Sequence, residues 1–258
     1  MNLQPHLKIN KQQISPYILL PGDPGRVDTT GAYLDNFKIL ANNREFRIGV
    51  GTYRNKLITV CSTGIGCPST AIAVEELIDA GAKYIIRVGT CGGAWRADIP
   101  AGSLIIPTAS IRDEGTTMEY IPQGFPAVAD INIVNALTQA AQNESATYFV
   151  GINRTHDAFY GAPETITKWG AYMRNEQWKN LDTPIISSEM ESAALFVIAN
   201  LRNVKAGAIF AVNANPEPLK DRVLGKEMEV KTEIAEDITR QTVEKIIQVA
   251  LEAISALP

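Results

Sequence analysis

The most constraining feature of this sequence is residues 83–93, which read Lys-Tyr-Ile-Ile-Arg-Val-Gly-Thr-Cys-Gly-Gly. The first part is a short apolar run, rich in β-branched and aromatic residues and stopped by glycines, which is typical of a strand. A run that is apolar throughout fits a strand covered on both faces, as in a parallel sheet. The stretch therefore predicts an inner strand of an α/β protein.

Arg87 lies inside this strand, and arginine is almost never buried without a partner. Gly89, Gly92 and Gly93 then allow the backbone to turn closely past a neighbouring group. A buried cation beside a glycine turn at the carboxyl end of a strand is a common way to hold an anion. The alternative is an ion pair between Arg87 and a structural carboxylate, which this stretch alone does not distinguish from an anion site.

The composition limits the classes of function. A chain of 258 residues, 45% of them hydrophobic, can bury a full core, and we expect one α/β domain over residues 1–258. The formal net charge of −4 provides no field that would attract nucleic acid or an anionic membrane. No apolar run approaches the ~18 residues of a membrane span, and the first residues are too polar for a signal peptide. Three cysteines without metal-binding spacing indicate a cytoplasmic protein.

Strands alternate with helices along the chain. We expect strands at residues 17–20, 46–53, 57–61, 83–88, 103–110, 147–153, 184–187 and 205–212. We expect helices at residues 27–34, 68–80, 131–142, 168–179 and 189–201 and in the C-terminal segment. This order predicts an α/β/α sandwich with a central mixed, mostly parallel sheet.

Ligands of such sheets bind at the carboxyl ends of the strands, where four turns lie: residues 22–26, 63–66, 89–93 and 213–215. The first turn places backbone N–H groups and Arg26 at a helix start, which favours anions. The second turn, residues 63–66, also leads into a helix, which begins at Pro68. It lacks the lysine of a P-loop, which argues against a nucleoside triphosphate as ligand. The third lacks the spacing of a dinucleotide fingerprint.

Residues 188–191, Ser-Glu-Met-Glu, have two interpretations. Ser188 and Glu191 have the spacing of a capping box before an apolar helix. Alternatively, Glu191 accepts hydrogen bonds from sugar hydroxyls. Two further charged features, His6 and residues 44–47, have an ordinary interpretation as solvated surface.

Together, the motifs resemble the nucleoside phosphorylase-I family, and within it the uridine phosphorylases most closely. The matching segments are residues 22–26, 44–46, 61–66, 68–69, 87–93, 114–116, 125–130, 157–161 and 188–194. They extend over most of the chain, from His6 to Val212. The opening residues 6–9 and 25–28 also resemble parasite purine nucleoside phosphorylases of this family.

The resemblance implies a phosphate site and a ribose site that two subunits share. The phosphate would be held by Gly22, Arg26, Arg87 and Thr90, and by Arg44 of a neighbouring subunit. The ribose would be held by Thr90, Met190 and Glu191, with His6 of the neighbour at its 5′ end. The catalytic residues would be Arg87, Glu191 and Arg26.

The resemblance also implies a base pocket walled by Cys91, Gly92, Phe159 and Tyr160. Here the sequence departs from the family, because residues 161–166 contain neither the glutamine nor the arginine with which uridine phosphorylases read uracil. Residues 213–216 replace both the arginine of many uridine phosphorylases and the aspartate of purine phosphorylases. Asparagine donates a hydrogen bond but not an acid proton. The polar candidates that remain for base recognition are Glu164, Asn213 and Asn215.

The implied reaction is phosphorolysis of a ribonucleoside to a free base and ribose 1-phosphate, with uridine as the first choice and a purine nucleoside as the runner-up. Arginines suit it because they position and neutralise a phosphate dianion, and the sugar develops oxocarbenium character. Hydrolytic nucleosidases of the same fold use water and do not need Arg26, Arg44 and Arg87. A non-catalytic nucleoside or phosphate binder is a third alternative.

The resemblance has further consequences for partners. We expect inorganic phosphate as a co-substrate, no other cofactor, and a homo-oligomer that is at least a dimer and, as in the family, a hexamer. Some uridine phosphorylases bind a potassium ion at the dimer interface, at positions that match Glu45, Ile65 and Ser69. We expect no other metal.

Overall fold

The computed structural model of this chain describes residues 3–92, 98–159, 185–214 and 232–258. Its strands are β1 (Tyr17–Pro21), β2 (Asp35–Asn43), β3 (Phe46–Tyr53), β4 (Lys56–Cys61), β5 (Tyr84–Gly92), β6 (Leu104–Asp113), β7 (Ala127–Val128), β8 (Tyr148–His156), β9 (Ile185–Glu189) and β10 (Lys205–Ala214). Its helices are α1 (Gly25–Gly31), α2 (Cys67–Asp79), α3 (Thr116–Tyr120), α4 (Ile131–Asn143), α7 (Ser192–Leu201) and α9 (Thr232–Ala256).

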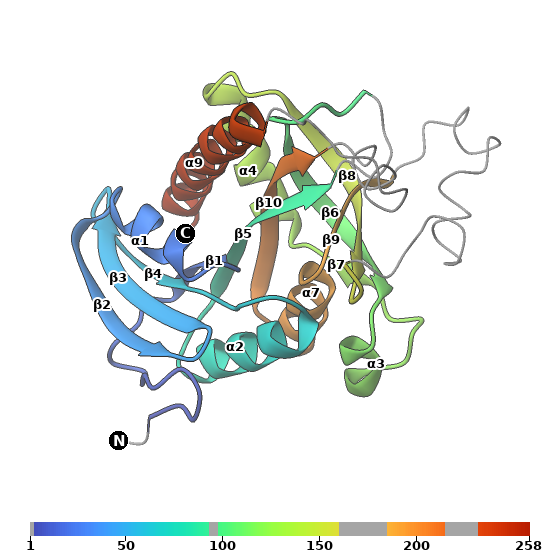
Figure 1. Ribbon diagram of the computed structural model, residues 1–258. Coiled ribbons are helices and arrows are strands. Elements are labelled where there is room, and N and C mark those ends of the chain that lie inside the picture. The colour runs from blue at the N-terminus through green and yellow to red at the C-terminus, as the bar shows by residue number, and fades with distance from the viewer. Residues whose placement is uncertain (1–2, 93–97, 160–184, 215–231) are drawn as a thin grey trace.

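The strands form one sheet in the order β10-β6-β8-β9-β5-β1-β4-β3-β2, with β7 paired to β6 (Figure 1). Parallel pairings join β1 to β4 and β5, β5 to β10, and β8 to β6 and β9. Antiparallel pairings occur in the β2-β3-β4 edge and in short joins at β5–β9, β6–β7 and β6–β10. The additional β5–β10 pairing closes part of the sheet into a ring. The predicted α/β fold with a central mixed sheet is confirmed.

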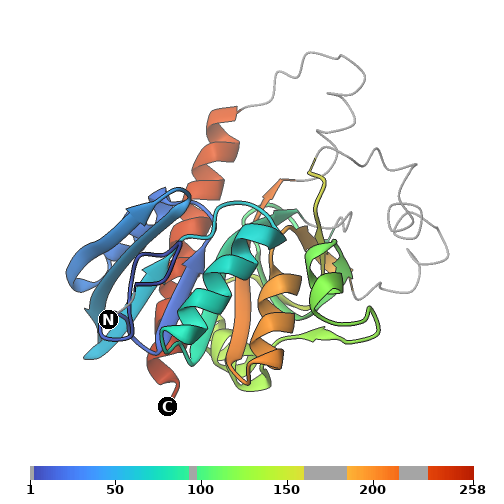
Figure 2. The ribbon, with the colours of Figure 1, turned by 90° about the horizontal axis from the view of Figure 1, so that it is seen from below.

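Helices cover both faces of the sheet. Helices α2 and α7 pack on one face, where Leu77 and Phe196 belong to the same buried cluster. Helices α4 and α9 pack on the other face, where Leu137 and Leu251 are buried together. Figure 2 shows α2 and α7 in front of the strands and α9 behind them. Within the described ranges, no helix is both long and apolar enough to cross a membrane.

Strand β5 lies at the centre of the sheet, beside β1 and β10. Ile85, Ile86 and Val88 are fully or almost fully buried, as the apolar run predicts. Because β1, β4, β5 and β10 are linked by parallel pairings, their carboxyl ends lie at one edge of the sheet. Strand β9 meets that edge from the opposite direction, with Gly92 paired to Ser188. The fold therefore brings the predicted turns into one region.

Several elements differ from those predicted. Residues 35–43 form β2, which the sequence did not indicate because most of its side chains are exposed or half-buried on an edge strand. The helix predicted at residues 189–201 begins only at Ser192, because residues 185–189 continue as β9. Short elements α3 and β7 were not expected. The helix predicted at residues 168–179 lies outside the described residues.

Candidate active site

Two loops that follow parallel strands are held together by backbone hydrogen bonds. The N–H of Thr63 donates to the carbonyl of Pro21 at 3.0 Å, and the N–H of Gly64 donates to that of Gly22 at 2.8 Å. A side chain at Gly22 would begin 3.2 Å from the Gly64 carbonyl and 3.8 Å from Nη1 of Arg87. A side chain here would therefore press on the Gly64 carbonyl, so a glycine at position 22 lets the two loops approach closely.

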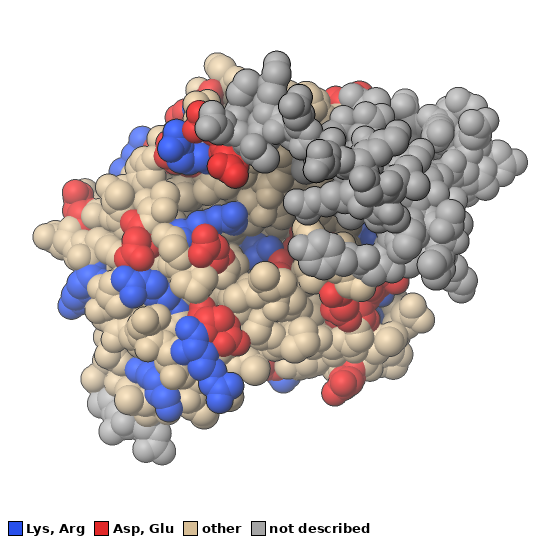
Figure 3. Space-filling model, in the orientation of Figure 1, with Lys and Arg blue, Asp and Glu red and all other residues tan. Residues whose placement is uncertain are grey.

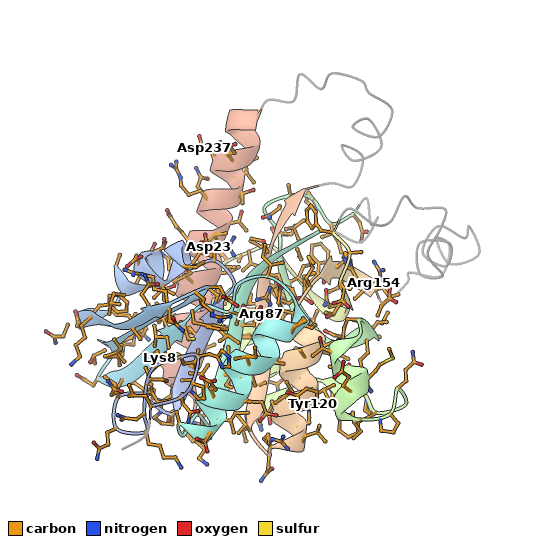
Figure 4. All side chains as sticks on the ribbon, turned by 60° about the horizontal axis from the view of Figure 1, so that its bottom comes forward. Lys8, Asp23, Arg87, Tyr120, Arg154 and Asp237 are labelled. Carbon is orange, nitrogen blue, oxygen red and sulfur yellow. The ribbon has the colours of Figure 1, made fainter. Side chains whose placement is uncertain are left out.

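Arg87 is 4% exposed and lies between two buried carboxylates. Its Nε donates to Oε2 of Glu189 at 3.1 Å, and its Nη2 donates to Oε2 of Glu191. Burial lowers the pKa of Arg87, but the negative charges of Glu191 and Glu189 outweigh burial and raise it above its usual value. Figure 4 shows Arg87 in the interior of the molecule, beside the N-terminal end of α2. The guanidinium therefore carries its charge at neutral pH.

The third nitrogen of this guanidinium distinguishes the two interpretations of Arg87. Nη1 is buried and has no hydrogen-bond partner among the described residues. The structural ion pair predicted as an alternative is present, yet it leaves one donor nitrogen unused. That nitrogen lies on the side of Gly22. A buried cationic donor without a partner is costly, and an anionic ligand would satisfy it.

Arg26, in the first turn of α1, is close enough to Arg87 and Glu191 for their charges to affect its pKa. Burial lowers its pKa, Asp23 raises it, and the positive charge of Arg87 lowers it further. Two guanidinium groups near each other repel, so an anion between them would be stabilised by both.

Figure 3 shows acidic and basic side chains next to each other around a hollow on one face of the molecule, so the described residues around it carry no field of one sign.

Glu191 reaches toward α2 as well as toward Arg87. Its Oε1 accepts a hydrogen bond of 2.6 Å from the N–H of Gly66, the residue before α2. The residue is 5% exposed. Burial raises the pKa of Glu191, Arg87 lowers it, and the neighbouring charge of Glu189 raises it again, so the net shift is upward.

Of the two interpretations of residues 188–191, the capping box is wrong. Glu191 itself is the residue before α7, and the hydroxyl of Ser188 is buried without a hydrogen-bond partner in the described ranges. The carboxylate of Glu189 instead accepts hydrogen bonds at the start of the helix, from the N–H groups of Glu191 and Ser192 at 2.9 and 3.0 Å. The side chain of Glu191 is thereby left for Gly66 and Arg87.

Sequence reasoning assigned no role to Glu189. It is 5% exposed and lies at the end of β9, one residue outside the predicted sugar-binding pair. A second acidic residue inside the same short motif was the only signal of its importance. Only the fold shows that it contacts Arg87.

The residues predicted near the ribose and the base lie at the ends of β5, β9 and β10. Thr90 and Gly92 are half-buried on β5, and Cys91 between them is buried, which raises the pKa of its thiol well above the usual value. The carbonyl of Met190 accepts from the Cys67 thiol at 3.3 Å. Asn213 lies at a register shift of β10, and its Oδ1 is buried without a partner within the described part of the chain.

The remaining base-pocket residues give less information. Phe159, the last described residue before residues 160–184, is 61% exposed. Tyr160, Glu164 and Asn215 lie outside the described residues.

Arg44 and His6 form no hydrogen bond or ion pair with Arg87 or Arg26 in the described part of the chain. Arg44 is exposed in the turn between β2 and β3, with a φ of 56°, and makes no ion pair in the described ranges. His6 Nδ1 lies 2.6 Å from Oε1 of Glu76, on α2. It lines a surface groove of about 640 Å³ between α2 and α3, together with Pro68, Ala71, Ile72, Glu75, Glu76, Gly115, Thr116, Glu119, Tyr120 and Asp157.

The three residues that match a potassium site lie close together. The Ser69 hydroxyl donates to the carbonyl of Ile65 at 3.2 Å. A side chain at Gly64 would begin 2.8 Å from Cγ of Glu45 and 3.7 Å from Oγ of Ser69. Carboxylate, carbonyl and hydroxyl oxygens of this kind are hard ligands that suit an alkali or alkaline-earth cation.

The sequence also matches a family model. The model described as the phosphorylase superfamily covers residues 16–255 of this chain. The chain belongs to the phosphorylase superfamily. Membership in this superfamily confirms the resemblance on which the site residues were selected.

Individual members of the superfamily are similar along nearly the whole chain. A guanosine phosphorylase of Halorubrum lacusprofundi is 35% identical over 258 residues, 100% of both chains. A uridine phosphorylase of Treponema pallidum is 38% identical, over 98% of this chain and 93% of its own. The crystal structure of a uridine phosphorylase from Vibrio fischeri has a TM-score of 0.86 at 32% identity and covers 100% of this chain and 98% of that one.

Proposed function

We propose that this chain catalyses the phosphorolysis of a nucleoside, transferring the pentosyl group from the base to inorganic phosphate. The observation that carries the proposal is the buried guanidinium of Arg87. Its Nη1 lies beside Gly22 and has no hydrogen-bond partner in the part of the chain that the structure describes, and its Nη2 donates to the carboxylate of Glu191. One side chain thus offers a donor to an anion and contacts a carboxylate able to bind sugar hydroxyls.

Phosphate would lie against Gly22, Arg26, Arg87 and Thr90, at the carboxyl ends of β1 and β5. Arg87 would donate to the phosphate through Nη1, and a bidentate contact, which suits a phosphate dianion better than the point charge of lysine, would come from Arg26. Burial lowers the pKa of Arg26 and the charge of Arg87 lowers it further; the dianion would relieve this repulsion. Inorganic phosphate is then a co-substrate, and the proposal needs no organic cofactor.

Ribose would lie between this phosphate and Glu191. As the bond to the base breaks, positive charge spreads into an oxocarbenium-like sugar. An ionised Glu191 would accept hydrogen bonds from the ribose hydroxyls and stabilise that charge. Thr90 and Met190 would complete the ribose contacts from β5 and from the segment before α7.

A second copy of the chain would complete the site. Arg44 is exposed, His6 is partly exposed beside Glu76, and neither bonds to Arg87 in the described ranges, which supports their predicted action across a subunit contact. The groove that His6 lines provides a surface for such a contact. We propose at least a dimer and, following the family, a hexamer.

Uridine is the first candidate substrate, because the chain is similar to the uridine phosphorylase of Treponema pallidum. A purine nucleoside is the second candidate, because the guanosine phosphorylase of Halorubrum lacusprofundi is similar over its whole length. Cys91, Gly92, Phe159 and Asn213 are the described residues that we assign to the base pocket.

The deciding experiment is incubation with uridine, thymidine, inosine, guanosine and adenosine, each with and without phosphate. Release of base only in the presence of phosphate is the expected result. Release without phosphate would indicate a hydrolytic nucleosidase, and binding without release would indicate a non-catalytic binder; either would overturn the proposal.

Two minor parts of the proposal concern a cation and the cellular location. Glu45, Ile65 and Ser69 would bind potassium, which predicts higher activity in potassium chloride than in sodium chloride at equal ionic strength. All three cysteines are free thiols, which supports a reducing cytoplasm.

A further inference from the structure

Glu189 is a buried carboxylate to which the proposed function gives no role. Its side chain is 2% exposed at the carboxyl end of β9. Its oxygens accept hydrogen bonds from Arg87 Nε (3.1 Å), Asn153 Nδ2 (2.9 Å), Thr155 Oγ1 (2.7 Å), Ser192 Oγ (2.7 Å), the Glu191 N–H (2.9 Å) and the Ser192 N–H (3.0 Å). A buried carboxylate with this many donors is fully satisfied and held in one place.

The two oxygens of Glu189 face different parts of the protein. Oε1 accepts from Asn153 and Thr155 on β8 and from Ser192 on α7, which belong to the rigid scaffold. Oε2 accepts from Arg87 and from the backbone of Glu191, which belong to the candidate active site, and the Ser192 N–H is shared between the two oxygens at 3.1 and 3.0 Å. The carboxylate therefore joins the scaffold to the site.

The contact with Arg87 decides which nitrogen is left for a ligand. A guanidinium is a rigid planar fork, so a bond at Nε fixes the direction of the other two nitrogens. With Nε held by Glu189 and Nη2 by Glu191, Nη1 is the nitrogen on the side of Gly22.

The contact with Glu191 acts on the backbone. Oε2 of Glu189 holds the Glu191 N–H at 2.9 Å, immediately before α7. From this position the Glu191 carboxylate reaches the Gly66 N–H at 2.6 Å. One oxygen of Glu189 thus positions the two side chains that the proposed function places against phosphate and ribose.

We propose that Glu189 is the positioning residue of this active site, fixing Arg87 and Glu191 at the spacing that phosphorolysis requires. The inference rests on the proposed function. Its physical basis is that preorganised groups do not have to reorient during the reaction. Burial raises the pKa of Glu189, but the charge of Arg87 and the hydrogen bonds from Ser192 and Thr155 hold it below its usual value, so the carboxylate stays ionised.

Two substitutions test this role, one that removes the charge of Glu189 and one that shortens its side chain. Glu189→Gln keeps the length of the side chain but turns one acceptor into a donor that faces other donors. Glu189→Asp keeps the charge but is one methylene too short to span β8 and Arg87. We expect kcat/KM for phosphate to fall about 10–100-fold in both, as for other groups that orient a contact residue. The assays are run below the melting temperature of each variant, with folding checked by circular dichroism.

A buried carboxylate without this role is the matched control. Glu114 is 5% exposed and accepts from the Thr117 N–H at 3.0 Å in the first turn of α3. Glu114→Gln should lower the melting temperature while kcat/KM for phosphate stays at the wild-type value. If either folded Glu189 variant also kept the wild-type kcat/KM, the inference would be overturned.

If neither Glu189 variant folds, Ser192→Ala decides, because it removes one donor from Oε1 and leaves the charge in place. We expect a several-fold rise of the phosphate KM, and an unchanged KM would refute the positioning role. The proposed function fails separately, if the wild-type protein releases no base with phosphate. In that event phosphate affinity, measured by titration calorimetry on the same variants, still tests whether Glu189 positions Arg87.

Discussion

The three nitrogens of Arg87 have different neighbours, and this division allows one residue to be both structural and functional. Nε and Nη2 neutralise Glu189 and Glu191, while Nη1 has no partner in the described ranges. Arg87→Ala would leave two buried carboxylates unpaired, at a cost of about 3–5 kcal/mol in unfolding free energy. Such a variant cannot separate phosphate binding from folding.

Arg87→Lys separates them better, because a cation remains beside the carboxylates. We expect kcat/KM for phosphate to fall by on the order of 10², since lysine lacks the planar fork. Arg112 is the control: it is 8% exposed and donates to the carbonyls of Pro122 and Phe125. Arg112→Lys should lower the melting temperature without changing the phosphate KM. Equal kinetics in the two variants would contradict a phosphate contact at Arg87.

Glu191 predicts a particular pH dependence. Its pKa is raised above the usual 4.5 by burial and by Glu189, against the opposing effect of Arg87. The ionised form binds ribose hydroxyls, so nucleoside affinity is lost as the pH falls through this raised pKa. We expect kcat/KM for the nucleoside to decline on the acid side with an apparent pKa above 4.5.

The variant Glu191→Gln tests this assignment. It cannot ionise, so we expect a loss of about 10²–10³ in kcat/KM and a flat acid limb. Glu144→Gln, which alters only a surface pair with Lys245, should leave the acid limb in place. An acid limb that persists in Glu191→Gln would assign it to another group.

At the scale of the element, α2 begins and ends at glycines that have positive φ. Gly66, before its first turn, has a φ of 95° and donates its N–H to Glu191. Gly81, after its last turn, has a φ of 112°, and apart from its chain neighbours no described residue has an atom within 4 Å of where a Cβ would lie. Both glycines have a positive φ, but only Gly66 contacts the candidate active site.

Alanine substitutions at Gly66 and Gly81 distinguish the cost of backbone strain from an effect on activity. Each substitution should destabilise the fold by about 1–3 kcal/mol, because a positive φ is unfavourable for residues with a Cβ. We expect Gly66→Ala to lower activity per folded molecule as well, since relaxation of the backbone moves the N–H away from Glu191. Gly81→Ala should lose stability alone. Thermal unfolding and kcat/KM, measured in parallel, check this, and equal activity in both variants would contradict it.

At the scale of the whole molecule, the proposed site is incomplete in one chain. Arg44 is exposed in the β2–β3 turn, and His6 is held at the surface by Glu76. Their predicted roles require a second copy that brings these side chains to Arg87 and Glu191.

Complementation between two inactive variants tests this arrangement. Arg44→Ala and Arg87→Lys are each expected to be nearly inactive alone. In a mixed oligomer, purified through two different tags after co-expression, one site receives an intact Arg44 and an intact Arg87, so activity should return. If Arg44 acts within its own chain, no site is intact and activity stays low. Sedimentation of the wild-type protein measures the oligomeric state independently.

Local patterns predicted most of the fold, but not every element. The apolar run at residues 84–88 predicted β5 because a doubly covered strand needs apolar residues on both faces. Strand β2 was missed because an edge strand with exposed side chains carries no such pattern. The boundary between β9 and α7 was misplaced because the side chain of Glu189, which accepts from the N–H groups two and three residues later, sets the start of the helix, whereas the sequence pattern favoured Ser188.

The sequence by itself determined the family, the α/β fold and the identity of Arg26, Arg87 and Glu191 as candidates, because motifs and periodicity are local properties of a chain. Only the tertiary structure decided how those residues are paired. It placed two carboxylates on Arg87, left Nη1 beside Gly22, and gave Glu189 its contacts with β8 and α7. Such contacts join residues that are up to 104 positions apart, and the distances and directions that define them are set by strand pairing, which no local pattern encodes.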